Sequence, residues 1–189
     1  MEAFMNTAAV VGLGEMGDKT QVLALLLAVR YRRSLPILFG IFIATLLTMG
    51  VTALLGTTIS SLVPTPILRW LLVAMFFGVA LWTLIPEEDD DDEDIPAKSS
   101  TSLVLTAFIA FILAELGDKS QIATLIMAAK YGSFGSVMAG ATVGEMLAIS
   151  PAVLLGKTTA QWIPLKWMRI AAATLFAALG AWILIFGLE

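Results

Sequence analysis

The sequence contains no cysteine and no histidine. Without cysteine, the chain has no disulfides, no thiolate metal site and no cysteine nucleophile. Without histidine, it lacks the side chain that most often acts as a general base or binds a transition metal. Any metal site must therefore use oxygen ligands.

Charge is also scarce outside one short acidic run. Charged residues make up 14% of the chain, against about a quarter in a soluble domain. Apolar residues make up 59%, and the mean hydropathy is +0.92. Much of the acidic charge lies in the run Glu87 to Asp94. This composition excludes a soluble domain and predicts a protein embedded in the lipid bilayer. It gives no reason to expect nucleic acid as a partner, and protein partners are unknown.

Six segments are long and apolar enough to cross a membrane, since a spanning helix needs roughly 20 mostly apolar residues. They are residues 4–29, 36–59, 66–85, 101–129, 134–156 and 167–187. Prolines, glycines or charged residues lie between them. The sequence therefore predicts an all-α membrane protein with six transmembrane helices.

An internal repeat relates the two halves of the chain, because a shift of 100 residues aligns them without a gap. The register holds for Gly40 and Gly140 and for Trp82 and Trp182, among others. Each half holds three spans, an odd number, so the second half must be inverted relative to the first. Such inverted three-helix repeats are typical of secondary transporters, whose site lies between the repeats near the midplane. The predicted units are residues 1–86, an acidic linker at 87–100, and residues 101–189.

Basic residues near the ends of the spans predict the orientation. Most of them fall on one side, and only Arg69 and Lys130 fall on the other. Because cytoplasmic loops carry the excess of lysine and arginine, both termini are expected outside and the acidic linker in the cytoplasm, at the inner (cell) membrane of a bacterium. The linker itself is either a solvated connection or a collector of divalent cations.

One acidic motif lies inside the first predicted span of each half. Residues 12–21 read Gly-Leu-Gly-Glu-Met-Gly-Asp-Lys-Thr-Gln, and residues 114–121 read Ala-Glu-Leu-Gly-Asp-Lys-Ser-Gln. Glu15 and Glu115 fall near the middle of their spans, where a charge costs at least about 2.5–3.5 kcal/mol. On one continuous helix, the glutamate, aspartate and glutamine of each motif would share a broad face.

Two such faces opposed to each other would form an all-oxygen metal site. The candidate ligands are Glu15, Asp18, Thr20, Gln21, Glu115, Asp118, Ser120 and Gln121. Their carboxylate, amide and hydroxyl oxygens suit a hard divalent cation such as Mn²⁺, Ca²⁺ or Mg²⁺. The motif glycines allow either close helix contact or a local unwinding that frees carbonyl groups for the ion.

Three further charged residues accompany these ligands. Lys19 and Lys119 are expected to compensate part of the negative charge. Each also lies four residues after a glutamate and could instead form a purely structural ion pair within one helix, although this would leave Asp18 and Asp118 unneutralised. Glu145, whose repeat partner is Thr45, is a candidate for proton coupling.

The doubled Glu-x-Gly-Asp-Lys-Thr/Ser motif resembles that of the Gdt and transmembrane protein 165-like family (uncharacterised protein family 16), which includes bacterial manganese exporters of the MneA type. The resemblance covers the whole chain, including the glutamine after each motif and the acidic linker. It implies a cation/proton antiporter that moves manganese or calcium out of the cytosol, and therefore a protein that is not an enzyme and holds no cofactor. It also implies that the eight candidate ligands bind the transported cation, with protons as the coupling ion.

Two other classes of protein are compatible with the same residues. A passive divalent-cation channel would also line its path with acidic side chains. An intramembrane aspartyl protease would place Asp18 and Asp118 on facing helices, but the lysine beside each aspartate does not suit a dyad that shares one proton. Dependence of transport on a pH gradient would separate the antiporter from the channel.

Overall fold

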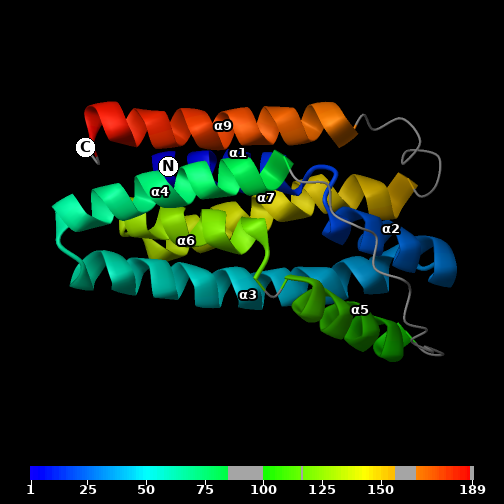
Figure 1. Cartoon of the computed structure of the whole chain (residues 1–189). Coiled ribbons are helices and arrows are strands. Elements are labelled where there is room, and N and C mark those ends of the chain that lie inside the picture. The colour runs from blue at the N-terminus through cyan, green and yellow to red at the C-terminus, as the bar shows by residue number, and fades with distance from the viewer. Residues whose placement is uncertain (85–99, 116, 156–164, 188–189) are drawn as a thin grey trace.

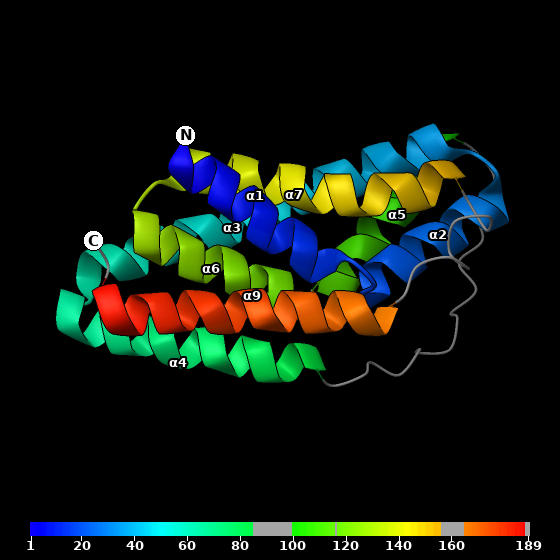
Figure 2. The ribbon, with the colours of Figure 1, turned by 90° about the horizontal axis from the view of Figure 1, so that it is seen from above.

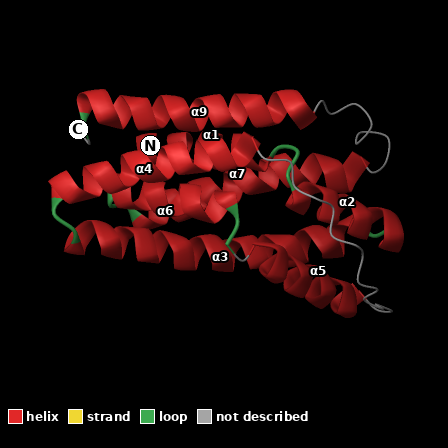
Figure 3. Cartoon of the chain, viewed as in Figure 1, coloured by secondary structure: helices red, strands yellow, loops and turns green. Residues whose placement is uncertain are grey.

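The computed structural model describes residues 1–84, 100–115, 117–155 and 165–187. Within these ranges every regular element is a helix and no strand is present (Figure 3). The all-α prediction is therefore confirmed for the described residues. The acidic run at 87–94 and nearly all of the predicted linker lie outside them, as do residues 156–164.

Eight helices make up the described part of the chain. They are α1 (Glu2–Glu15), α2 (Lys19–Tyr31), α3 (Ser34–Leu62), α4 (Thr65–Leu84), α5 (Ser100–Glu115), α6 (Lys119–Tyr131), α7 (Phe134–Leu155) and α9 (Leu165–Phe186). Two of them, Ser34–Leu62 and Phe134–Leu154, are long and apolar enough to cross a membrane, and α5 and α6 together form a third candidate span bent by 72°. Thr65–Leu81 and Ala173–Phe186 are shorter apolar helices.

The prediction of one continuous helix through each acidic motif is wrong. In place of single helices over 4–29 and 101–129, the chain breaks between α1 and α2 and again between α5 and α6. Gly17 and Gly117 lie in the left-handed region, with φ of 78° and 76°, a conformation that only glycine adopts readily. Asp18 and Asp118 then act as N-caps of α2 and α6. The motif residues therefore meet at a break and do not share one helical face.

The two broken helices run in opposite directions. Figures 1 and 2 show α1 running from the end of the molecule where both termini lie toward the middle, with α2 continuing to the far end. The pair α5 and α6 runs back the other way. The start of α5 lies toward the far end, opposite the termini (Figure 1). This arrangement brings the two breaks together near the middle of the bundle.

Glycines allow the helices that carry the breaks to pack closely. Gly40 of α3 lies against the backbone of α5 at Val104, and Gly140 of α7 lies against the backbone of α1 at Phe4. These two contacts are related by the same shift of 100 residues as the motifs. At each glycine, an added Cβ would collide with the facing carbonyl oxygen, so small residues are required for this approach.

Large apolar side chains remain exposed around the bundle. On α3 these include Leu47, Val51, Leu54 and Leu55, each more than half exposed. A soluble monomer rarely shows such a continuous apolar surface. The exposed apolar surface fits an integral membrane protein whose helices face lipid.

Candidate cation-binding site

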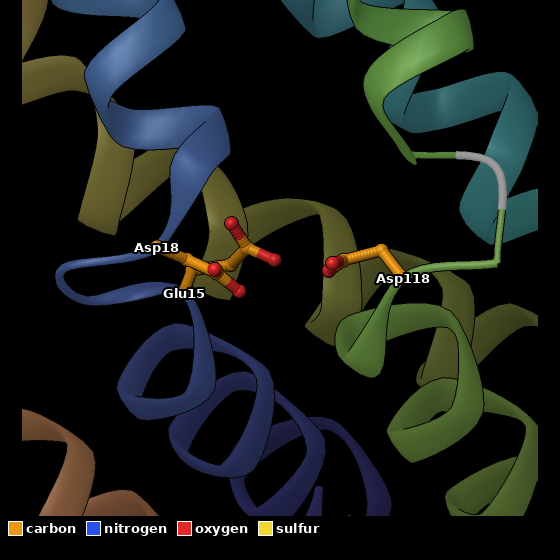
Figure 4. A group of neighbouring side chains, drawn as sticks. All are labelled: Glu15, Asp18 and Asp118. Carbon is orange, nitrogen blue, oxygen red and sulfur yellow. The ribbon is translucent and has the colours of Figure 1, made fainter. Parts of the chain in front are cut away.

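Three buried carboxylates from the two breaks converge in the middle of the molecule. Glu15 is the last residue of α1, and Asp18 and Asp118 precede α2 and α6. One oxygen from each of the three side chains lies within 4.8 Å of the others. Figure 4 shows Asp118 pointing across the gap toward Glu15 and Asp18. We refer to these three residues as the carboxylate triad.

Hydroxyl groups from the motifs orient two members of the carboxylate triad. Thr20 Oγ1 donates a hydrogen bond to Glu15 Oε2. Ser120 donates to Asp118 Oδ2 through both its hydroxyl group, at 2.9 Å, and its backbone N–H, at 3.2 Å. The second oxygens, Glu15 Oε1 and Asp118 Oδ1, are buried and accept no hydrogen bond from the described residues. Buried carboxylate oxygens without a donor are unfavourable and are therefore available to a cation.

The motif lysines form ion pairs across the two motifs. Lys119 Nζ lies 3.4 Å from Asp18 Oδ1, and Lys19 Nζ lies 3.9 Å from Asp118 Oδ1. The purely structural alternative requires each lysine to pair with the glutamate four residues earlier. Neither of these two ion pairs involves that glutamate. Each lysine therefore contacts the aspartate of the other half of the chain.

The motif glutamines support the chain breaks. Gly17 N–H donates to Gln21 Oε1 at 2.9 Å, and Gln21 Nε2 donates to the carbonyl oxygen of Ala148 on α7 at 2.7 Å. Gly117 N–H donates to Gln121 Oε1 at 3.4 Å. The amide oxygens predicted as ligands are thus engaged with the backbone of the breaks, outside the carboxylate triad.

Glu115 belongs to a second polar cluster beside the triad. Its carboxylate accepts hydrogen bonds from Thr45 Oγ1, at 3.3 Å, and from Thr48 Oγ1. Thr45 Oγ1 also lies 2.8 Å from Oε1 of Glu145, which is fully buried. We call Thr45, Thr48, Glu115 and Glu145 the threonine–glutamate cluster. Through Thr45, this cluster links Glu145 to Glu115, one of the two motif glutamates.

Thr45 and Thr48 are functional candidates that the motif search missed. With Thr52 they form a buried polar stripe along one face of the otherwise apolar α3. Their spacing of three and four residues could have revealed this stripe in the sequence. The link to Glu145 depends on packing between distant helices.

The site combines converging carboxylates, hydroxyl groups and opposed helix ends. Two helices end there and two begin there, an arrangement that broken helices of transporters use to bind ions. Asp18 and Asp118 each face a lysine, so they do not form an isolated pair of the kind that shares a proton. The donor set fits a hard divalent cation, which takes oxygen ligands at about 2.0–2.6 Å.

Comparison with known proteins gives consistent matches over nearly the whole chain. The sequence model of the family described as "Divalent cation/proton antiporter GDT1" matches residues 3–91 and 103–189. The chain is 44% identical to a Vibrio cholerae protein named "Putative manganese exporter", over 93% of this chain and 87% of that protein. It is 32% identical to GDT1-like protein sll0615 of Synechocystis, over 93% of each. It is 29% identical to GDT1-like protein 5 of Arabidopsis thaliana, over 95% and 94%. No solved structure matches the chain.

Proposed function

Because the chain belongs to the GDT1 family of divalent cation/proton antiporters, we propose that it exports Mn²⁺ from the cytosol in exchange for protons. Members of this family are membrane transporters, not enzymes. The observation that carries the proposal is the carboxylate triad, in which both motifs supply buried oxygens to one place. The relative named "Putative manganese exporter" supports Mn²⁺ as the main cargo, and Ca²⁺ would compete with it.

The transported ion would bind between the two chain breaks. Glu15, Asp18 and Asp118 would be its direct ligands, and Thr20 and Ser120 would keep the carboxylates oriented. Glu115, the fourth motif carboxylate, would act from the neighbouring threonine–glutamate cluster. Gln21 and Gln121 would contribute mainly by holding the breaks.

The chain would cross the membrane six times, as two inverted halves of three spans each. Such a repeat would allow the site to open in turn to each side of the membrane. Contacts between repeat partners support it: Phe76 and Phe176 pack with ring centroids 6.5 Å apart, and Thr45 lies beside Glu145. A residue and its repeat partner are expected to contact each other where both lie near a pseudo-two-fold axis. Rocking of one half against the other would then open the same site to either side.

We propose the orientation that the basic residues near the ends of the spans favour. We place both termini outside and the acidic linker in the cytoplasm, in the inner membrane of a bacterium. The start of α5, which follows the linker, lies toward the end of the bundle opposite the termini, and this supports the proposed topology (Figure 1).

Charge balance would couple the cation to protons. With the four motif carboxylates ionised and both motif lysines protonated, two negative charges remain. One divalent cation neutralises them, and so would two protons, whereas a buried site with unbalanced charge is unfavourable. The exchange would therefore carry two protons for each cation, or three if Glu145 also takes part.

Transport by the purified protein in sealed vesicles tests this function. We expect an imposed pH gradient to drive Mn²⁺ flux and Ca²⁺ to compete with it. Mg²⁺ should be a poor substrate because it dehydrates reluctantly, and Zn²⁺ should be poor because the site offers no nitrogen or sulfur ligand. Protein-free vesicles are the control. Mn²⁺ flux that ignores the pH gradient would contradict antiport and indicate a channel.

Glu145 provides a separate test of the coupling. If it carries a third proton, the exchange moves net charge, and wild-type flux at a fixed pH gradient should vary with membrane potential. The Glu145→Gln variant should then lose this voltage dependence while still transporting Mn²⁺. Wild-type flux that does not respond to voltage would instead support two protons and exclude Glu145 from the coupling.

A further inference from the structure

We infer that Lys119 is a tethered counter-cation of the site, whose ammonium group compensates part of the negative charge of the carboxylate triad when no metal is bound and moves off Asp18 when a divalent cation enters. The inference rests on the proposed function, because it concerns the same site. Lys119 Nζ lies 3.4 Å from Oδ1 and 3.5 Å from Oδ2 of Asp18, a carboxylate of the opposite motif.

The position of Lys119 is unfavourable for an ordinary structural lysine. Its side chain is only 5% exposed, although lysine is almost never buried unless it is paired. Lys119 is also the first residue of α6, and the positive end of a helix dipole repels a cation. Its contact with Asp18 offsets both effects. The lysine is thus held at the site by the carboxylate that the transported ion would use.

Binding of a divalent cation and formation of this ion pair compete for the same oxygens. Lys119 is within reach of both oxygens of Asp18, while Asp18 also belongs to the triad formed with Glu15 and Asp118. A metal ion within coordination distance of Asp18 would meet the ammonium group at short range, where like charges repel strongly in a medium of low polarity. The cation must therefore push Lys119 aside.

This competition would benefit a transporter. A group of buried carboxylates without a cation is energetically unfavourable. By supplying a positive charge, Lys119 stabilises the empty site while it changes from facing one side of the membrane to facing the other. By returning to Asp18 it also helps the cargo to leave. Transport requires binding that is favourable enough for entry but weak enough for release, and Lys119 shifts the balance toward release.

Lys19 occupies the same position in the other motif and provides a matched control. It lies 3.9 Å from Asp118 Oδ1, but 44% of its side chain is exposed. Water solvates and screens an exposed ammonium group, so such an ion pair contributes little. The two lysines therefore differ in burial and not in sequence context.

The test measures Mn²⁺ affinity of the purified full-length protein by calorimetry, and flux in vesicles, for three variants. We expect Lys119→Gln to bind Mn²⁺ at least about tenfold more tightly than wild type, because close charge pairs couple by more than this factor, and to transport more slowly at saturating Mn²⁺. Lys119→Arg should keep an affinity close to wild type because it retains the charge. Lys19→Gln should increase the affinity by a smaller factor than Lys119→Gln, because water already solvates and screens the exposed ammonium group of Lys19.

The outcomes separate this inference from the proposed function. A wild-type protein that neither binds nor transports Mn²⁺ would contradict the proposed function itself. A wild-type protein that transports Mn²⁺, together with Lys119→Gln binding at or below wild-type affinity, would overturn only the role of Lys119.

A second measurement covers the case in which Lys119→Gln does not fold. Modification of lysines by an amine-reactive reagent can be followed by mass spectrometry on the wild-type protein. Addition of Mn²⁺ should increase the reaction of Lys119 relative to Lys130, because the displaced amine leaves its ion pair. Unchanged or reduced reaction of Lys119 would overturn the inference.

Discussion

Replacing Glu15 by glutamine or Asp118 by asparagine is expected to abolish most Mn²⁺ transport while the protein still folds. Each change keeps the shape of a triad side chain but removes one of the charges that hold the cation. Even residues that only orient metal ligands lower affinity or activity by about 10- to 100-fold when they are changed, so a direct ligand should matter at least as much. Flux in vesicles and thermal unfolding in detergent measure the two properties.

These two positions are chosen because neither leaves a buried lysine unpaired. Lys19, the partner of Asp118, is partly exposed and can be solvated, whereas Asp18→Asn would strand the buried Lys119. Removing one of several buried like charges also relieves repulsion, so the midpoint of unfolding should stay level or rise. Glu2→Gln makes the same change at the exposed start of α1 and should leave flux unchanged. Full flux in both triad variants would contradict a site shared between the two motifs.

Replacing Gly144 by alanine should destabilise the protein and reduce transport, because α1 and α7 approach each other too closely for a side chain there. An added Cβ would overlap the carbonyl oxygen of Ala8 and lie 3.0 Å from its Cα. Overpacking of this kind typically costs about 1–3 kcal/mol, although alanine returns up to about 1 kcal/mol of helix propensity. Since α1 ends at Glu15, its displacement also disturbs the triad.

Gly78→Ala is the matched control for this prediction. Gly78 also lies inside a helix, α4, but nothing lies within 4 Å of an added Cβ. Alanine should therefore leave stability unchanged or raise it by up to about 1 kcal/mol. The midpoint of thermal unfolding in detergent is expected to fall for Gly144→Ala and not for Gly78→Ala. Equal midpoints of unfolding for the two variants would contradict the prediction, because they would show that α1 and α7 can move apart without loss of stability.

Local patterns were sufficient to predict the class of protein and to identify candidate residues for a cation site. Sparse charge and long apolar segments predicted a helical membrane protein, because burial in lipid depends mainly on composition. The repeated motif predicted an oxygen-rich cation site, because carboxylates at this depth in a membrane are too costly without a function. The pairing of the two motifs was predictable as well, since both lie at the same position in their halves.

Only the tertiary structure decided how those residues are arranged. The motif spacing is compatible with a continuous helix or with a break, and the break forms because Gly17 and Gly117 adopt positive φ while Asp18 and Asp118 cap new helices. The partners of Lys119 and Glu145 lie about a hundred residues away in the sequence. No local periodicity specifies such contacts. They depend on the close, glycine-mediated packing that brings two oppositely directed helix breaks together in the middle of the protein.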